Sequence, residues 1–374
     1  MSILLLLVGL FLFVGLVVVH EYGHYLAARR GGVDVEEFGI GFPPRAWGKK
    51  LKSGMELTLN WLPLGGFVKL KGEHDSATEK GSFGAAPLMT KVKIMLAGVG
   101  MNLLTAFLML TLLAFIGMPK LLENQFTVQS DTKVTRNEVI AGFVESDSPA
   151  GKAGLLVRDK IIRIDGADKQ FEIKQASDLP AATSSNAGKE VTITVIRQGE
   201  SKTLTTTLRP EAEVAASKKT DDPKGYLGVS PTEYTIRRST WSSPIVAAGV
   251  LKQFTTETLK GLGSALLNVS KGKGSEASKQ VSGPVGIFVI LKDGSLLGIQ
   301  FILMIIAIIS LTLAIMNALP IPALDGGRLF VTLLYRAMNK PLSQSTEEKI
   351  HGTGFIVLMG LFLLITVIDV KRFF

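Results

Sequence analysis

The chain has 374 residues, 47% of them hydrophobic and gathered in blocks, which points to an integral membrane protein rather than a soluble enzyme. Its formal net charge of +9 is spread through loops without an aromatic-basic face, so we expect membrane-surface contact and no nucleic-acid partner. The chain has no cysteine, which excludes disulfides and thiolate metal sites, so a metal would need His, Asp, Glu or water.

The first apolar run covers residues 2–19 and continues as a helix to about residue 28, so we predict transmembrane span 1 over residues 1–28. At about 1.5 Å of rise per residue, this segment is long enough for a hydrocarbon core of ~30 Å. Arg29 and Arg30 stand where a secretory signal would carry a small-residue cleavage site. We therefore expect the span to remain attached, with its C-terminal end in the cytoplasm.

A polar, basic stretch follows at 29–93 and is predicted to be a cytoplasmic loop. Within it, residues 56–71 alternate apolar and polar side chains on both sides of Pro63-Leu64-Gly65-Gly66. This alternation predicts a membrane-associated β-hairpin after span 1. The next apolar block predicts transmembrane span 2 at 94–118.

Residues 127–230 form a soluble stretch with strand-like runs at 139–144, 160–164 and 191–196. The stretch also holds three short motifs: Ser148-Pro149-Ala150, Ala153-Gly154-Leu155 and Asp159 to Gly166. The stretch resembles a PDZ domain, a small α+β module that binds a peptide or a carboxyl-terminal tail at a sheet edge. An unrelated small α+β domain is the alternative. We expect this domain to be inserted between spans 2 and 3, outside the cytoplasm.

The region 242–297 is expected to hold an amphipathic helix at the membrane surface or the rim of the site (242–269), a flexible linker (271–279) and a loop at Gly283-Pro284-Val285-Gly286-Ile287. Transmembrane span 3 is predicted over 298–338 as a broken span, because two prolines and two glycines lie in NALPIPALDGG at 317–327. Span 4 is expected at 354–370. The predicted fold class is a polytopic α-helical membrane protein with about four transmembrane helices and both termini outside the cytoplasm.

The segment His20-Glu21-Tyr22-Gly23-His24 carries the strongest chemical signal. On a helix, His20 and His24 lie on one face, and Glu21 lies about 100° round, beside the first histidine. This arrangement predicts a Zn²⁺ site with two imidazole ligands and a carboxylate general base, as in metalloproteases. Two histidines satisfied within a core are the alternative, which fits poorly because ionisable residues on an apolar helix are costly in lipid.

A hydrolytic zinc site usually has three protein ligands, so a distant residue has to supply the third. Asp325 is the best candidate, because it is a lone acid in an apolar segment and the break at Pro320 and Pro322 can turn it into a protein-lined cavity. A helix-capping role for Asp325 is the alternative. The rival ligands lie in the loop after span 1 and look like solvated charges: Glu36, Glu37, Glu56 and Glu73.

Three further polar residues need an interpretation. His74 and His351 lie in polar loops and are interpreted as bystanders. Asn317 stands at the break in span 3. Its amide can either hydrogen-bond the backbone of an extended substrate or cap a helix end.

HEYGH in the first span, NALPIPALDGG in a late span and the PDZ-like stretch between them resemble the site-2 protease family, the intramembrane zinc metalloproteases, in its bacterial single-chain form. The resemblance covers nearly the whole chain and extends to further pieces: Phe38 to Phe42, Trp61 to Lys69, Ala97-Gly98 with Asn102, and Gly283 to Ile287. The chain departs from the pattern in having one PDZ-like stretch where the best-known proteobacterial members have two. Val99-Gly100 also replaces a common Gly-Pro pair.

The resemblance implies that His20, His24 and Asp325 hold zinc. It also implies that Glu21 is the general base and acid, and that Asn317 contacts the substrate backbone. The hairpin would pair as a sheet edge with an unwound substrate helix, through Leu57, Leu59, Gly65, Gly66 and Val68.

The expected function is an intramembrane zinc metalloendopeptidase of the inner or plasma membrane, with its active site towards the cytoplasmic side. Its expected substrates are single-span membrane proteins, such as anti-sigma factors or remnant signal peptides. Two other hypotheses remain open. One is a membrane-anchored protease whose cytosolic site uses a glutamate as third ligand. The other is a catalytically idle scaffold that holds partners through its PDZ domain.

Overall fold

The computed structural model describes residues 2–167, 169–197, 199–218, 220, 223–278 and 280–374. The chain divides into two compact units. Unit 1 consists of Met1–Met118, Gln125–Val128 and Thr240–Phe374, and unit 2 consists of Pro119–Asn124 and Gln129–Ser239.

Unit 1 is mainly helical, and four of its helices are long and apolar enough to cross a membrane: α1 (Ser2–Arg30), α2 (Leu88–Ile116), α9 (Ile299–Ala318) and α11 (Gln344–Phe373). The chain is therefore a polytopic membrane protein with four candidate spans, as the hydropathy pattern predicts. α2 begins six residues before the expected start of span 2, and α11 extends beyond residues 354–370 at both ends.

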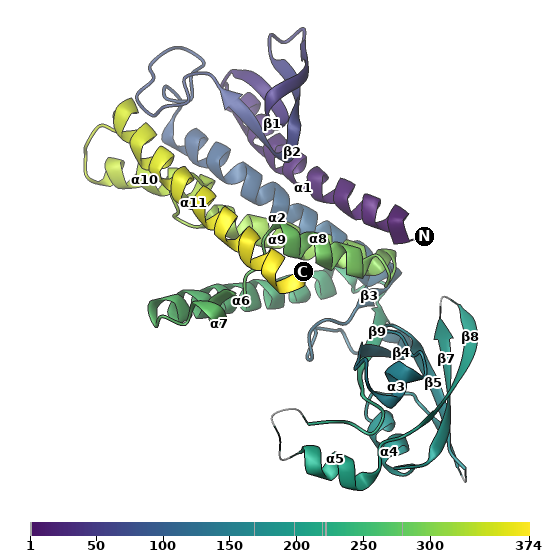
Figure 1. Ribbon diagram of the computed structural model, residues 1–374. Coiled ribbons are helices and arrows are strands. Elements are labelled where there is room, and N and C mark those ends of the chain that lie inside the picture. Colours follow the sequence, from purple (N-terminus) through teal and green to yellow (C-terminus); the bar gives the residue numbers. More distant parts are fainter. Residues whose placement is uncertain (1, 168, 198, 219, 221–222, 279) are drawn as a thin grey trace. The chain divides into compact units, whose positions relative to one another are not determined.

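α1, α2 and α9 pack together and form the framework of unit 1 (Figure 1). Leu16 of α1 and Ile302 and Ile306 of α9 are fully buried in one apolar cluster. At Gly23 of α1, an added Cβ would lie 2.6 Å from the carbonyl oxygen of Ala97 on α2. Small residues at such positions let two helix backbones approach closely within a membrane.

The sheet of unit 1 corrects the predicted hairpin. β1 (Val35–Lys50) pairs antiparallel with β2 (Glu56–Leu70), so the hairpin turn lies near residues 51–55 and not at Pro63 to Gly66. Both strands bend, and the paired segments follow the order 66–70, 35–40, 56–59 and 45–50. The segment 56–59 is therefore paired on both sides, whereas 66–70 forms an outer edge.

The predicted break in span 3 is present between α9 and α10 (Asp325–Ala337). Ala323 in this break has a φ of +77°, and its N–H donates to His351 Nδ1 at 3.1 Å. A Cβ at Gly326 would lie 2.3 Å from the Ala318 carbonyl oxygen, and one at Gly327 would lie 1.9 Å from that of Ile321. Only glycine therefore fits where α10 folds back against the break.

The region after unit 2 contains α6 (Ser243–Ser270), α7 (Gly274–Ser278) and α8 (Pro284–Gly294). The expected loop at 283–287 is wrong, because Gly283 is the N-cap of α8 and the other four residues form its first turn. α6 matches the expected amphipathic helix closely in its bounds. α7 lies inside the segment 271–279, so the expectation of a linker without regular structure is wrong at that point. Asp369 of α11 accepts hydrogen bonds from Gly283 N and Gly286 N, both at 2.8 Å, and so caps the first turn of α8.

Unit 2 is a small α+β domain around a sheet in the order β3-β9-β4-β5-β7-β8, with β6 paired to β5. The strands are β3 (Met118–Pro119), β4 (Lys133–Val144), β5 (Lys160–Asp165), β6 (Gln170–Glu172), β7 (Glu190–Arg197), β8 (Glu200–Thr207) and β9 (Val229–Arg238). Its helices are α3 (Pro149–Lys152), α4 (Asp178–Ser184) and α5 (Glu211–Ser217). The three predicted strand-like runs lie in β4, β5 and β7, whose alternate residues, such as Ile161, Ile193 and Val195, are fully buried.

Candidate metal centre

Two histidines of α1 and the first residue of α10 bring three ligand atoms together. His20 Nε2 and His24 Nε2 are 3.2 Å apart, and Asp325 Oδ2 lies 3.1 Å from the first and 3.3 Å from the second. Among the described residues, this is the one cluster of three His, Asp or Glu side chains with suitable spacing for a metal ion. The structure thus joins residues that lie about three hundred positions apart in the sequence.

The three atoms fit a zinc ion. Tetrahedral ligands held at ~2.0–2.2 Å from Zn²⁺ lie roughly 3.3–3.5 Å from one another. The observed separations of 3.1–3.3 Å approach this spacing without any change in the backbone. Two imidazoles and one carboxylate also form a donor set typical of catalytic zinc, which keeps a further position for water or substrate.

Asp325 does not act as the cap of α10. The residue at the N-cap position is Leu324, and no side chain caps this helix end. The carboxylate of Asp325 instead lies against the two imidazoles. The helix-capping alternative is therefore wrong, and the break between α9 and α10 turns the carboxylate into the bundle.

Outer contacts from α2 orient both imidazoles. His24 Nδ1 lies 2.8 Å from the carbonyl oxygen of Ile94, so Nδ1 carries the proton and Nε2 keeps its lone pair. Gly98 of α2 lies against both rings, since a Cβ there would be 2.4 Å from His24 Nε2 and 2.6 Å from His20 Nε2. The glycine leaves the space that the imidazoles occupy.

Glu21 lies between two cavities that meet at the cluster. The loop-side cavity, of about 180 Å³, is lined by Glu21, Val68, Glu73, Arg328 and the three ligands. The hairpin-side cavity, of about 300 Å³, is lined by Glu21, Gly65, Gly66, Asn102 and Asn317, again with Asp325. The carboxylate can therefore exchange protons with groups that enter from either side.

The family comparison agrees with this geometry. Residues 8–361 match the peptidase family M50. The chain belongs to this family. The resemblance to site-2 proteases is thereby confirmed, and with it the class of metalloprotease.

The relatives match over nearly their full length. The chain is 31% identical over 373 residues to a protein of Fusobacterium nucleatum named as a zinc metalloprotease, covering 100% of this chain and 98% of the relative. It is 28% identical over 442 residues to the regulator of sigma-W protease RasP of Bacillus subtilis, with 96% of each chain covered. It is 26% identical over 446 residues to the protease Eep of Enterococcus faecalis, covering 96% and 97%.

The rival glutamates of this M50 chain are paired elsewhere. Glu36 forms an ion pair with Lys69 at 3.0 Å. Glu37 and Glu56 each lie 3.1 Å from Arg45. Glu73 lines the loop-side cavity but forms an ion pair with Arg328 at 2.9 Å. The structure brings none of the four into the cluster, which argues against a cytosolic site with a glutamate ligand.

The proposed substrate contacts divide into two groups. Gly65, Gly66 and Val68 line the two cavities, and Asn317 lines the hairpin-side cavity. Leu57 and Leu59 lie in the segment that is paired on both sides, with Phe38 and Ile40 on one side and Lys49 and Trp47 on the other. A substrate strand cannot add there, so this part of the predicted hairpin edge is wrong.

His351 lies in α11 and not in a loop, and its ring accepts the N–H of Ala323, two residues before Asp325. His74 lies 3.5 Å from Glu348 and outside the metal cluster. Sequence reasoning also missed Arg328, which bonds Glu73 and lies 3.5 Å from Glu347 of α11. Its position three residues after Asp325, on the same face of α10, was the available signal.

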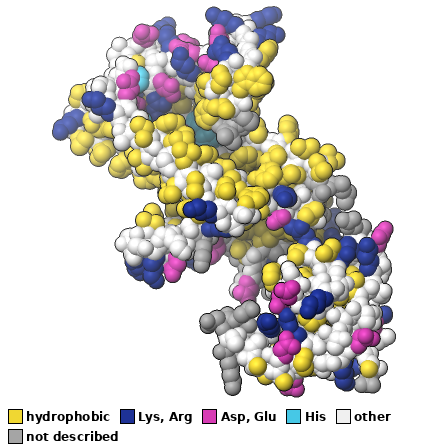
Figure 2. Space-filling model, viewed as in Figure 1, with side chains coloured by type: hydrophobic (Ala, Val, Ile, Leu, Met, Phe, Trp, Pro, Cys, Tyr) yellow, Lys and Arg dark blue, Asp and Glu magenta, His cyan; other side chains and the backbone are white. Residues whose placement is uncertain are grey.

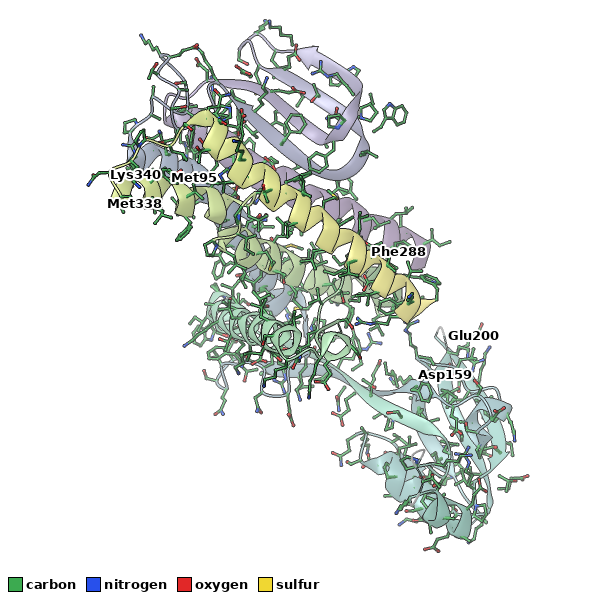
Figure 3. The ribbon with its side chains drawn as sticks, turned by 60° about the vertical axis from the view of Figure 1, so that its left-hand side comes forward. Met95, Asp159, Glu200, Phe288, Met338 and Lys340 are labelled. Atoms are coloured by element: carbon green, nitrogen blue, oxygen red, sulfur yellow. The ribbon has the colours of Figure 1, made fainter. Side chains whose placement is uncertain are left out.

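Charged side chains gather over the end of unit 1 at which the metal cluster lies, beside a surface that is largely hydrophobic (Figure 2). An outer cavity of about 460 Å³ lies among them and is lined by Glu73, Asp325, Arg328, Glu347 and His351. α10 and α2 pack against each other, and Met95 of α2 lines the loop-side cavity together with Asp325 and Arg328 of α10. Figure 3 labels Met95 on α2, and Met338 and Lys340 just after the end of α10. Asp325 of the metal cluster therefore borders an open cavity that has charged side chains in its lining.

Proposed function

We propose that this chain is an intramembrane zinc metalloendopeptidase that hydrolyses peptide bonds of single-span membrane proteins in regulated intramembrane proteolysis. The observation that carries the proposal is the cluster of His20, His24 and Asp325. The two histidines lie on α1, a helix long enough to span a membrane, and Asp325 begins α10, which follows the span-length helix α9. Soluble metalloproteases need no such setting. A ligand set reached through polar cavities inside an apolar bundle suits a substrate that lies in the bilayer.

The residues have distinct roles in this proposal. His20, His24 and Asp325 hold the zinc ion, which acidifies water and polarises a carbonyl group when bound. Glu21 takes a proton from the attacking water and returns it to the leaving amine. The half-buried position of Glu21 between the two cavities supports this role.

The substrate is expected to bind as an extended strand along the outer edge at residues 66–70. Peptide-bond hydrolysis requires an unwound segment, because a helix engages its own carbonyl groups. Gly66 supports this pairing, since a Cβ there would lie 3.1 Å from the Glu21 side chain and would crowd the base. The amide of Asn317 would bond the substrate backbone from the opposite wall of the hairpin-side cavity.

The partners and topology follow from the same proposal. The name of the Bacillus relative, a regulator of sigma-W protease, supports membrane-bound anti-sigma factors as a substrate class, beside remnant signal peptides. We propose that unit 2 is a PDZ domain outside the cytoplasm that binds peptides or carboxyl-terminal tails. The active site would face the cytoplasmic side, because Arg29 and Arg30 end α1 there.

The test uses the purified full chain in liposomes with zinc and a labelled single-span substrate. Glu21→Gln should retain zinc and lose cleavage by a factor of about 10³ or more, by analogy with other lost general bases. Asp325→Asn should lose both. Glu276→Gln, on the exposed helix α7, is the matched control and should retain both.

Cleavage that survives Glu21→Gln would overturn the proposed catalytic role of this site. A wild-type chain that binds zinc and substrate without cutting would instead favour the scaffold hypothesis. Deletion of unit 2 should leave intact the cutting of a substrate whose part outside the cytoplasm has already been removed. It should alter the choice between substrates that lack this part and substrates that still carry it.

A further inference from the structure

The outer partner of His20 is the side chain of Asn102 on α2. Asn102 Nδ2 lies 3.2 Å from His20 Nδ1, and the asparagine is 1% exposed. Its other amide atom, Oδ1, is buried and has no hydrogen-bond partner among the described residues. Buried polar atoms are normally satisfied, so this carbonyl oxygen needs an explanation.

The backbone of Asn102 is held in place. Ser310 of α9, which is fully buried, donates its hydroxyl to the carbonyl oxygen of Asn102 at 2.8 Å. This bond fixes the position of the residue between α1 and α9. The side-chain amide can still exchange Nδ2 and Oδ1 by a half turn about its last bond, which changes the group that faces His20 from donor to acceptor.

The orientation of the Asn102 amide decides which ring nitrogen of His20 carries the proton. A neutral imidazole has one N–H, and a ligand nitrogen must be the one without it. With Nδ2 toward the ring, Nδ1 accepts, and the proton lies on Nε2, 3.1 Å from Asp325 Oδ2. With Oδ1 toward the ring, Nδ1 donates, and Nε2 offers its lone pair to the cluster. The position of the proton on His24 is fixed, because the Ile94 carbonyl oxygen can only accept a hydrogen bond from Nδ1.

We propose that Asn102 is a positioning residue that selects the metal-binding tautomer of His20 by turning Oδ1 toward Nδ1. The inference rests on the proposed function, since the metal concerned is the zinc of the protease site. Two observations support it together. The half turn gives the unsatisfied oxygen a donor, and it makes both histidines present lone pairs toward Asp325.

The first test compares the zinc affinity of Asn102 variants, by competition with a chelator on the detergent-purified full chain. Asn102→Leu keeps a similar volume without an acceptor and should weaken zinc binding about 10- to 100-fold. Asn102→Asp keeps an acceptor for Nδ1–H and should stay within a few fold of wild type. Thr105→Val is the matched control on α2, because its hydroxyl bonds the Met101 carbonyl and not a ligand.

The second test reads the tautomer directly, by ¹⁵N NMR of ring-labelled histidine in the zinc-loaded chain. His20 should show a protonated Nδ1 in wild type and in Asn102→Asp, and should lose this preference in Asn102→Leu. If the leucine variant fails to fold, Asn102→Ala, which adds no bulk, takes its place.

Three outcomes would overturn the inference. The first is wild-type zinc affinity in both apolar variants. The second is an equal loss in Asn102→Asp and Asn102→Leu, since the aspartate retains the acceptor. The third is a zinc-loaded wild type whose His20 Nδ1 carries no proton. A wild-type chain that binds no zinc would instead overturn the proposed function itself.

Discussion

The ligands of the candidate metal centre depend on a residue that has no side chain. Gly98 leaves room for both imidazoles, while Gly23, one helix away, lets the backbone of α1 approach α2. The ligand pair His20 and His24 was predictable from helical periodicity, and Asp325 from its isolation in an apolar break. The outer partners were not predictable, because a carbonyl such as that of Ile94 carries no sequence signal.

At this scale we predict that Gly98→Ala abolishes zinc binding. Its methyl group would lie within 2.6 Å of ring atoms of both histidines, too close for either ring to keep its place. Gly100→Ala on the same helix is the control, because nothing lies within 4 Å of its Cβ. The control should bind zinc normally and gain about 0.5–1 kcal/mol of helix stability. Zinc content of the purified variants gives the measurement, and equal content in both would contradict the prediction.

At the scale of elements, a loop after β2 ties three helices together. Arg328 of α10 bonds Glu73 in this loop, and the backbone N–H of Asp75 donates to Glu347 of α11 at 2.9 Å. Lys91 of α2 bonds Asp75 and is fully buried. These contacts join residues up to 272 positions apart, so hydropathy and periodicity could not predict them.

The two strands of unit 1 were also predictable only in part from the sequence pattern. β2 was recognisable because its apolar and polar residues alternate. Its partner β1 was missed, because Gly39, Gly41 and Pro43-Pro44 interrupt any alternation. The paired order of the four segments, and with it the identity of the free edge, follows from bends in both strands that the pattern does not contain.

We predict that Lys91→Met destabilises unit 1 by about 3–5 kcal/mol, because it removes one partner of a buried ion pair. Arg336 is the nearest remaining cation to Asp75, at 3.7 Å, and is half exposed. The double variant with Asp75→Asn should recover most of the loss. Lys260→Met, in an exposed pair with Glu257, should change stability by no more than ~0.5 kcal/mol. Unfolding of the detergent-purified chain measures all three, and a double variant no more stable than Lys91→Met would contradict the assignment.

At the scale of the whole molecule, each unit has a hydrophobic core of its own, so we expect the two to unfold in separate transitions. Composition and hydropathy predicted the division into a helical membrane part and an inserted α+β domain. They could not predict the strand order of the inserted domain, since β9 closes the sheet beside β4 from the far end of the insertion. Such nonlocal pairing depends on the whole core.

Acid should destabilise unit 2. The hydrogen bonds from the Arg209 guanidinium hold the pKa of Glu145 below its usual value of 4.5. A carboxylate with a lower pKa in the folded state adds stability that is fully present above pH 4.5 and is lost as the pH falls through the folded-state value. The unit 2 transition should therefore fall in temperature below about pH 4.5. Glu145→Gln should flatten this dependence, whereas Glu200→Gln, at an exposed site, should leave it unchanged.

A calorimetric scan from pH 7 to pH 3 separates these cases. The prediction fails if Glu145→Gln keeps the full wild-type slope below pH 4.5.

The position of Asp325 gives the bound metal a second role. A chain without cysteine has no covalent link between distant segments, yet its proposed zinc ligands come from the first helix and from a helix that begins about three hundred residues later. A metal held by both closes a loop of that length and restricts the unfolded chain much as a disulfide would. If the loop were cut within unit 2, the two pieces would still be tied at the active site. Removal of zinc would then destabilise the fold as well as abolish catalysis.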